Sequence, residues 1–221
     1  MKKFVLILAG GTGQRMLNEI PKQFILLNQK PILQYSIQAF FNSIPEINII
    51  IVLPESYFNM WFQLCDTYQI NIPHQTVKGG ITRFESVKNG LKLLPDDGLV
   101  AIHDGVRPFV SKDMILQLFH VAENYGNSIP AIQIDESVRI IEKNQNRLIN
   151  RKSLRIIQTP QCFDLSILKK AYQQEYNESF TDDASVLENI GIDIHLIEGS
   201  RKNIKITFPD DLAIAEFLLL K

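Results

Sequence analysis

The stretch "FVLILAGGTGQRM", Phe4 to Met16, sets the fold because an apolar run changes abruptly into glycines. The run from Phe4 to Ala9 is continuously apolar, which is typical of a parallel strand buried on both faces. Glycine loses more chain freedom on folding than any other residue, so Gly10, Gly11 and Gly13 indicate backbone that must approach something closely. We therefore expect a ligand-binding loop at the end of a first strand.

Similar apolar runs recur along the first half of the chain: "INIIIVL" from Ile47, "LVAIH" from Leu99 and "SIPAIQI" from Ser128. Between them, residues 32–41 and 82–94 carry apolar stripes at helical spacing. Strands that alternate with helices in this way predict an α/β fold, with a mostly parallel sheet between helix layers.

One segment breaks this alternation. In "SVRIIEKNQNRLINR", Ser137 to Arg151, two short strand-like pieces flank a polar turn with no helix to cover them. We expect a protruding β-arm inserted at about residues 136–152, with a plain surface hairpin as the alternative. The strand-then-helix order resumes with "NIKIT" from Asn203 and an apolar helix from Pro209 to Leu220, and we expect one domain over residues 1–221.

The composition narrows the class of protein. A formal charge of -1 over 221 residues argues against broad binding to nucleic acid or to a membrane surface, which would need a strong positive excess. No apolar run reaches the roughly 18 residues that a membrane span needs. Cys65 and Cys162 lie far apart and form no metal-binding cluster, which fits a reducing compartment. We expect a soluble, cytoplasmic protein without nucleic-acid or membrane partners.

The glycine loop matches neither of the two common phosphate-binding motifs. Met16 stands where the dinucleotide motif GxGxxG needs its third glycine, and the chain has no GxxxxGK[ST] string. An NAD-dependent oxidoreductase is thereby disfavoured. Instead, two cations follow the loop, Arg15 and then Lys22, which comes after Pro21. Fixed positive charge at this place suits a polyphosphate whose oxygens gain charge during a transfer reaction.

A second glycine turn, "KGGITRFES" from Lys78 to Ser86, precedes a predicted helix. Arg83 falls in the first turn of that helix, where a cation opposes the helix dipole. We therefore expect Arg83 either to have an anionic partner or to face solvent.

The third predicted strand ends in "HDGVRPF", His103 to Phe109, which places Asp104 and Arg107 at the strand end. Beside a triphosphate, an aspartate is a natural Mg²⁺ ligand, although Asp104 also suits a structural cap. His103 has two interpretations as well, a general base or a packed strand residue.

Six motifs carry a family resemblance: "LAGGTGQRM…PKQF", "GGITRFESVKNGL", "HDGVRPF", "QTPQCF", "FTDDASVLE" and "NIKIT…DL". In this order, from Leu6 to about Leu218, they resemble the 2-C-methyl-D-erythritol 4-phosphate cytidylyltransferases of the non-mevalonate isoprenoid pathway. The resemblance implies a Rossmann-like nucleotidyltransferase domain, a β-arm, a homodimer and a divalent metal, Mg²⁺. It also implies the reaction of CTP with methylerythritol phosphate to give the CDP-alcohol and pyrophosphate.

The resemblance assigns site residues by position. The CTP loop falls on Ala9, Gly10, Gly11, Gly13 and Arg15, with Lys22 as a second phosphate ligand, and the cytosine pocket falls on Gly80, Ile81, Arg83 and Ser86. The metal and substrate site falls on Asp104 and Arg107, and the alcohol phosphate falls on Ser137, Arg151, Thr159, Thr181 and Lys205. In the family the arm crosses to the partner subunit, so the resemblance places Ser137 and Arg151 in the neighbouring site.

The same set of residues implies a mechanism. Arg15, Lys22, Arg151 and Lys205 would be the catalytic cations, of which Arg15 and Lys22 stabilise the five-coordinate α-phosphorus. The attacking phosphate is already ionised at neutral pH, because its second pKa is about 6, so no general base is needed.

The chain departs from some relatives at three positions. Alanines stand in some of them at Gly10 and Gly105, and an acidic residue stands at Ile81. If the family contact at position 81 is made by backbone, Ile81 is harmless, whereas a side-chain contact would alter base selectivity. Two other activities stay open, a ribitol 5-phosphate cytidylyltransferase and a non-catalytic nucleotide-binding module; "FTDDAS" and "NIKIT" favour the erythritol enzyme over the ribitol one.

Overall fold

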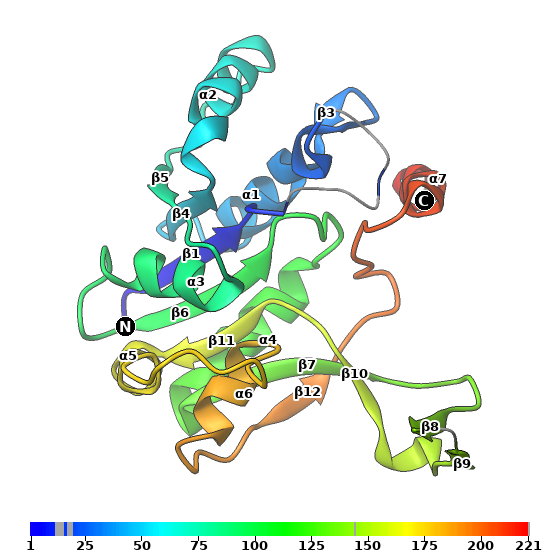
Figure 1. Ribbon diagram of the computed structural model, residues 1–221. Helices are drawn as coiled ribbons and strands as arrows, with labels where there is room; N and C mark the ends of the chain where they lie inside the picture. The colour runs from blue at the N-terminus through cyan, green and yellow to red at the C-terminus, as the bar shows by residue number, and fades with distance from the viewer. Residues whose placement is uncertain (12–15, 17–19, 144, 221) are drawn as a thin grey trace.

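A computed structural model describes residues 1–11, 16, 20–143 and 145–220 of the chain. Its central sheet has the strand order β10-β7-β11-β6-β1-β4-β5, with β12 also paired to β7 (Figure 1). The strands of this sheet are β1 Lys3–Leu8, β4 Asn48–Leu53, β5 Gln75–Lys78, β6 Leu99–Asp104, β7 Asn127–Gln133, β10 Arg155–Ile157, β11 Gln161–Asp164 and β12 Leu196–Glu198. Two small antiparallel pairs lie outside it, β2 Leu26–Leu27 with β3 Lys30–Pro31, and β8 Arg139–Glu142 with β9 Gln145–Leu148.

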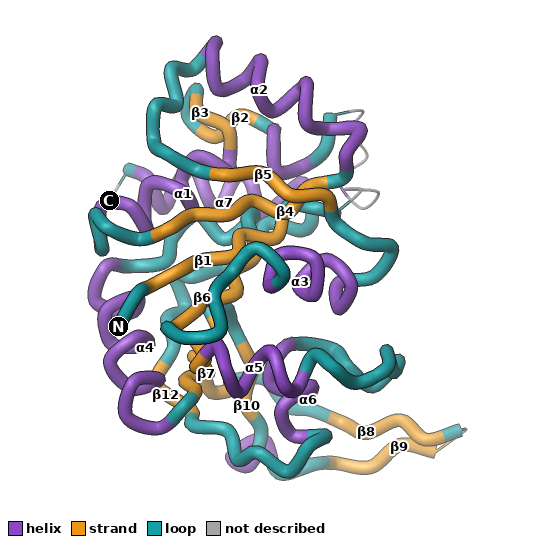
Figure 2. Tube along the Cα trace, turned by 90° about the vertical axis from the view of Figure 1, so that its left-hand side faces the viewer, coloured by secondary structure: helices purple, strands orange, loops and turns teal. Residues whose placement is uncertain are grey.

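Helices cover both faces of this sheet, as Figures 1 and 2 show from two directions. Along β1, Val5 and Ile7 pack into a core with α1, α2 and α4, whereas Phe4 and Leu6 pack into a second core with α3, α5 and α6. The α-helices are α1 Ile32–Ser43, α2 Phe58–Thr67, α3 Arg83–Leu91, α4 Lys112–Tyr125, α5 Leu165–Ala171, α6 Asp183–Glu188 and α7 Pro209–Leu219. Short 3-10 helices are η2 Lys22–Phe24, η3 Glu55–Tyr57 and η4 Arg151–Ser153.

The strands of one half of the sheet, from β6 to β5, run parallel. Strand β1 pairs in parallel with both β4 and β6, and β4 pairs in parallel with β5. The carboxyl ends of these strands, at Leu8, Leu53, Lys78 and Asp104, therefore share one edge of the sheet. The predicted α/β fold with a mostly parallel sheet is confirmed, and this edge is where ligands bind in open α/β sheets.

Strand β11 runs antiparallel between β6 and β7, which the sequence patterns did not predict. The apolar runs of β6 and β7 indicate only that both strands are buried, and they say nothing about which strand lies between them. The result is that Thr159 and Gln161 reach the same sheet edge as Asp104.

The predicted β-arm is the hairpin of β8 and β9, paired from Arg139 with Leu148 to Glu142 with Gln145. It projects from the body beyond β10 in both views (Figures 1 and 2). The final helix is also present as α7, after Pro209.

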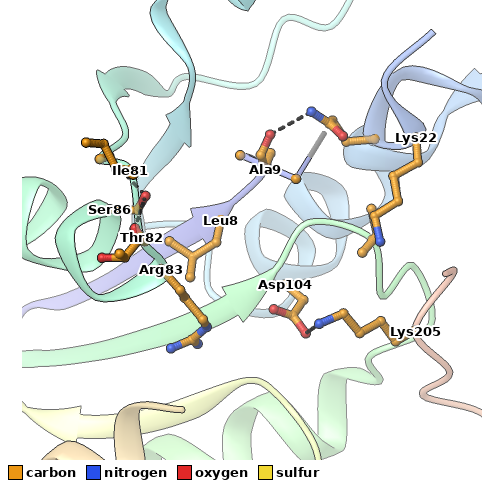
Figure 3. A pocket seen from close by; sticks show the side chains of 14 residues that line it. Leu8, Ala9, Lys22, Ile81, Thr82, Arg83, Ser86, Asp104 and Lys205 are labelled. Carbon is orange, nitrogen blue, oxygen red and sulfur yellow. Dashed lines mark hydrogen bonds and ion pairs between the residues drawn. The ribbon is translucent and has the colours of Figure 1, made fainter. Parts of the chain in front are cut away.

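The strand expected at "NIKIT" is wrong. Residues 203–207 have no regular structure, because side chains and single backbone contacts hold them instead of a ladder. The Asn203 amide donates to the Thr159 carbonyl at 2.8 Å, and the Ile206 N–H donates to the Val106 carbonyl at 2.9 Å. The segment still crosses the sheet edge, and it carries Lys205 there (Figure 3).

Two further expectations concern the compartment. None of the helices in the described ranges has the length and apolar character required to cross a membrane. Both cysteines are unpaired thiols, with Cys162 buried in β11 and Cys65 half-buried in α2. Burial raises the pKa of the Cys65 thiol to about 11, which keeps it protonated at neutral pH.

Gly90 lets α3 lie directly on β1, and we expect this contact to limit substitution. A Cβ at position 90 would lie 2.8 Å from Leu6 Cδ1, so Gly90→Val must push the helix away from the strand. We expect a loss of about 1–3 kcal/mol in the free energy of unfolding, measured by urea denaturation. Lys88→Val places the same side chain on a less buried face of α3, and an equal loss in both variants would contradict the packing argument.

Candidate functional site

A cavity of about 270 Å³ opens at the shared carboxyl edge of the sheet (Figure 3). Its walls come from the glycine loop, η2, the second glycine turn, the end of β6 and the C-terminal segment. The lining residues are Leu8, Ala9, Gly10, Gly11, Lys22, Gln23, Gly80, Ile81, Thr82, Arg83, Ser86, Asp104, Val106 and Lys205.

The glycine loop forms one wall, and η2 holds its start. The Gln23 amide donates to the Ala9 carbonyl at 2.7 Å, and the buried Lys22 donates from Nζ to the Ile206 carbonyl at 3.2 Å. Among the described residues, a Cβ at Gly10 would meet only Pro54 Cδ, at 3.9 Å, so they leave room for an alanine there. The predicted ligands Gly13 and Arg15 lie outside the described residues.

The second glycine turn forms the opposite wall and is held by α3. The Thr82 hydroxyl accepts from the Glu85 N–H at 3.1 Å, and Glu85 Oε2 accepts from the Ile81 N–H at 2.7 Å. Ser86 Oγ accepts from the Gly80 N–H at 3.0 Å. A Cβ at Gly80 would lie 2.2 Å from Glu85 Cβ, so only glycine fits this turn.

Ile81 stands at the mouth of the cavity. Its side chain is 98% exposed, while its N–H is bonded to Glu85. The fold at this position therefore depends on backbone, and the identity of the side chain does not affect packing.

Arg83 has an anionic partner, which is one of the two arrangements predicted from its place in the first helical turn. Nη1 donates to Asp183 Oδ1 at 2.8 Å and Nη2 donates to Oδ2 at 2.6 Å, a bidentate pair between α3 and α6. Burial opposes the charge, but the Asp183 carboxylate outweighs it and raises the pKa of Arg83. The side chain is 31% exposed and crosses from the second glycine turn toward Asp104 (Figure 3).

Asp104, at the end of β6, forms ion pairs with two further cations. Lys205 Nζ lies 3.0 Å and Arg107 Nε 3.2 Å from its Oδ2. Burial raises the pKa of Asp104, but Lys205, Arg83 and Arg107 together lower it below its ordinary value. The carboxylate is therefore anionic across the whole neutral range.

A second cavity, of about 300 Å³, adjoins the first and shares Arg83, Asp104 and Lys205 with it. Its other lining residues are Arg107, Ile157, Gln158, Thr159, Gln161, Thr181 and Asp182. The structure thus brings together the predicted residues Arg107, Thr159, Thr181 and Lys205. Ser137 lies just before β8, and Arg151 lies at the base of the arm, in η4. Neither residue lines these two cavities.

Two buried side chains were not singled out from the sequence: Gln161, which lines the second cavity, and Asp183, which lies behind Arg83. Gln161 Oε1 accepts from the Asp183 and Ala184 N–H groups, each at 3.1 Å, and its amide donates to Asp182. Asp183 binds Arg83 from the other side. Both residues stand inside the quoted strings "QTPQCF" and "FTDDASVLE", but their partners are distant in sequence and only the fold identifies them.

The donors available for a metal ion are few. Within the described ranges, no group of three or more His, Cys, Asp or Glu side chains is placed to hold one. Mg²⁺ commonly takes one or two carboxylates together with substrate phosphates, and the anionic Asp104 meets that smaller requirement.

His103 is a packed residue of β6. Its ring is fully buried, with Nε2 3.2 Å from the Arg107 carbonyl and Nδ1 3.3 Å from the Thr159 hydroxyl. Burial lowers the pKa of His103 to about 4. The neutral ring donates from Nε2 to the Arg107 carbonyl, and its Nδ1 accepts from the Thr159 hydroxyl. The same hydroxyl accepts from the Asp104 N–H at 3.0 Å.

This burial predicts a pH dependence of stability. The unfolded chain protonates His103 near its ordinary pKa of about 6.5, whereas the folded chain resists protonation down to about 4. The neutral, buried ring therefore contributes to the free energy of unfolding. This contribution is complete above pH 6.5, and it is lost as the pH falls toward 4, by at most about 1.4 kcal/mol per pH unit. In urea unfolding at several pH values, His103→Gln should flatten this slope. The exposed His120→Gln should leave the slope unchanged, and equal slopes in all three proteins would contradict the assignment.

Known proteins match this sequence along nearly its whole length. The family profile described as 2-C-methyl-D-erythritol 4-phosphate cytidylyltransferase matches residues 4–221. Relatives of that name from Phocaeicola vulgatus and Azobacteroides pseudotrichonymphae are 46% and 48% identical, over 99% of this chain and 100% and 99% of their own lengths.

A solved structure gives the same result. The crystal structure of 4-diphosphocytidyl-2C-methyl-D-erythritol synthase from Anaerococcus prevotii superposes with a TM-score of 0.84 at 27% identity, covering 100% of this chain and 99% of the other. The chain therefore belongs to the 2-C-methyl-D-erythritol 4-phosphate cytidylyltransferase family.

Proposed function

We propose that the chain transfers the cytidylyl group of CTP to 2-C-methyl-D-erythritol 4-phosphate in the cytoplasm, as a step of isoprenoid precursor synthesis. The observation that carries this proposal is the pair of adjoining cavities with a common wall of Arg83, Asp104 and Lys205. One cavity takes the nucleotide against the glycine loop, and the other takes the phosphate of the alcohol. Residues 1–221 act as a single nucleotidyltransferase domain with the arm as an insertion.

In the reaction, a phosphate oxygen of the alcohol attacks the α-phosphorus of CTP. A new P–O bond forms, the bond to the β-phosphate oxygen breaks, and pyrophosphate leaves. Lys22, and Arg15 by its place in the sequence, stabilise the charge that develops at the phosphorus. The attacking oxygen is already ionised, which agrees with a His103 ring that is buried, neutral and unsuited to act as a base.

The second cavity orients the attacking phosphate. Arg107, Lys205 and Thr181 supply cationic and hydroxyl donors there. Two anions repel each other, so holding them in line requires positive charge that is placed before they bind.

Magnesium fits this site as an ion shared between protein and nucleotide. Asp104 would hold it together with phosphate oxygens of CTP. When bound, the ion neutralises phosphate charge. Asp104 also positions Lys205 and Arg107, and it does so as an anion at any pH near neutrality.

The β-arm makes the proposed enzyme a homodimer. Ile141 and Leu148 expose apolar side chains on β8 and β9, and Arg151 lies at the base of the arm in η4. An arm that projects from its own body can reach a second copy, so we assign Ser137 and Arg151 to the partner's alcohol-phosphate site.

The substrate assignment is tested by pyrophosphate release. The four nucleoside triphosphates are each paired with methylerythritol phosphate and with ribitol 5-phosphate. We expect CTP with methylerythritol phosphate to exceed every other pair by at least about tenfold in kcat/KM, because polar groups of a built site are left unpaired by a wrong ligand. A preference for ribitol 5-phosphate would overturn the assignment, and CTP binding without turnover would favour the non-catalytic module.

Matched variants tie this activity to the site. Lys22→Ala should lower kcat by at least about 100-fold, which is the usual effect of removing one preorganised donor. Lys30→Ala removes the same charge from an exposed position on β3 and should leave kcat unchanged.

Subunit complementation tests the arm. Consider a mixed dimer of one Lys22→Ala chain and one Arg151→Ala chain, in which each site is completed by the partner's arm. One of its two sites then carries neither substitution, and the other site carries both. Random mixing should then restore about a quarter of the wild-type activity from two nearly inactive proteins. If Arg151 serves its own chain, every site carries one change and no activity returns.

A further inference from the structure

Asp183 is the most thoroughly bonded carboxylate near the site, and this inference about it rests on the proposed function. Its side chain is fully buried. Oδ1 accepts from Arg83 Nη1 at 2.8 Å and from the Tyr172 hydroxyl at 2.6 Å, while Oδ2 accepts from Arg83 Nη2 at 2.6 Å. Three hydrogen bonds and full burial restrict the motion of this carboxylate, so it is a rigid support for the guanidinium.

The sheet fixes the other side of Asp183. Gln161, fully buried in β11, accepts from the Asp183 and Ala184 N–H groups and thereby sets the position of α6. Tyr172 follows α5 directly and stacks on Phe84 of α3, with ring centroids 4.6 Å apart. The support of Arg83 therefore comes from three separate elements of the fold.

The guanidinium has N–H groups that this support does not use. Asp183 takes one N–H from each terminal nitrogen, and none of the others donates to a residue in the described ranges. The exposed part of Arg83 lines both cavities. In Figure 3 its side chain extends away from Ile81 and Ser86 of the second glycine turn, to the level of Asp104.

We propose that Asp183 and Tyr172 are positioning residues that hold Arg83 so that its remaining N–H groups donate to the phosphate of the alcohol. Arg83 is then a ligand of the second substrate, although its backbone belongs to the nucleotide turn. Because Asp183 compensates its charge, Arg83 contributes directed hydrogen bonds rather than net attraction. The pair also joins the nucleotide turn on α3 to the Thr181–Asp182 loop before α6.

A double-mutant cycle between Asp183→Asn and Arg83→Lys tests this assignment. Asparagine keeps the shape of the carboxylate but cannot accept both N–H groups, and lysine keeps the charge but lacks the fork. Asp183→Asn should raise the KM for methylerythritol phosphate by at least about tenfold and change the KM for CTP by less than about threefold. In the Arg83→Lys background the same change should add less than about twofold, because Asp183 acts through Arg83.

Two further variants separate positioning from folding. Tyr172→Phe keeps the ion pair and removes one donor, so it should raise the same KM by about two- to fivefold, and it replaces Asp183→Asn in the cycle if that protein does not fold. Glu188→Gln makes the same charge change on the exposed end of α6 and should leave both KM values unaltered.

The outcomes are distinct. Additive effects in the cycle, or an equal rise in both KM values, would overturn the positioning role while leaving the proposed function intact. A wild-type protein that releases no pyrophosphate with methylerythritol phosphate would overturn the proposed function, and the positioning role with it.

Discussion

The buried carboxylate of Asp104 is the interaction around which this site is organised. It ends the central strand β6 and binds Lys205 and Arg107 through one oxygen. Arg107 also donates to the Asn203 carbonyl at 2.8 Å, so the same group fixes the segment that delivers Lys205. An unpaired cation in such a place would carry a large desolvation cost, so carboxylate and cations depend on one another.

This arrangement suits a reaction between two anions. The cations of the shared wall are already held by acids, Arg83 by Asp183 and Lys205 by Asp104. They need little rearrangement when substrates bind, which is the condition for strong electrostatic stabilisation of a transition state. The compensating acids also keep the empty site from accumulating repulsive positive charge. The neutral, buried ring of His103 contacts the Thr159 hydroxyl, which accepts a hydrogen bond from the backbone of Asp104.

The sequence patterns predicted elements best where local physics decides them. Continuous apolar runs located β1, β4, β6 and β7, and the arm was visible as two short strands without a covering helix. The family resemblance assigned Ala9, Gly80 and Asp104 to one site, and the carboxyl edge that parallel strands share is the physical reason why they lie together. The antiparallel β11 and the irregular "NIKIT" segment were missed, because their environment comes from contacts that span the chain.

The sequence by itself determined four strands of the sheet (β1, β4, β6 and β7), the glycine turns and the list of cations, since strand burial, glycine geometry and charge are properties of short segments. Only the tertiary structure decided how those cations are held. Arg83 meets Asp183 a hundred positions away, and Lys22 meets the Ile206 carbonyl 184 positions away. Such pairings follow from how the whole chain packs, because a bidentate bond depends on the relative placement of two helices that no local pattern encodes.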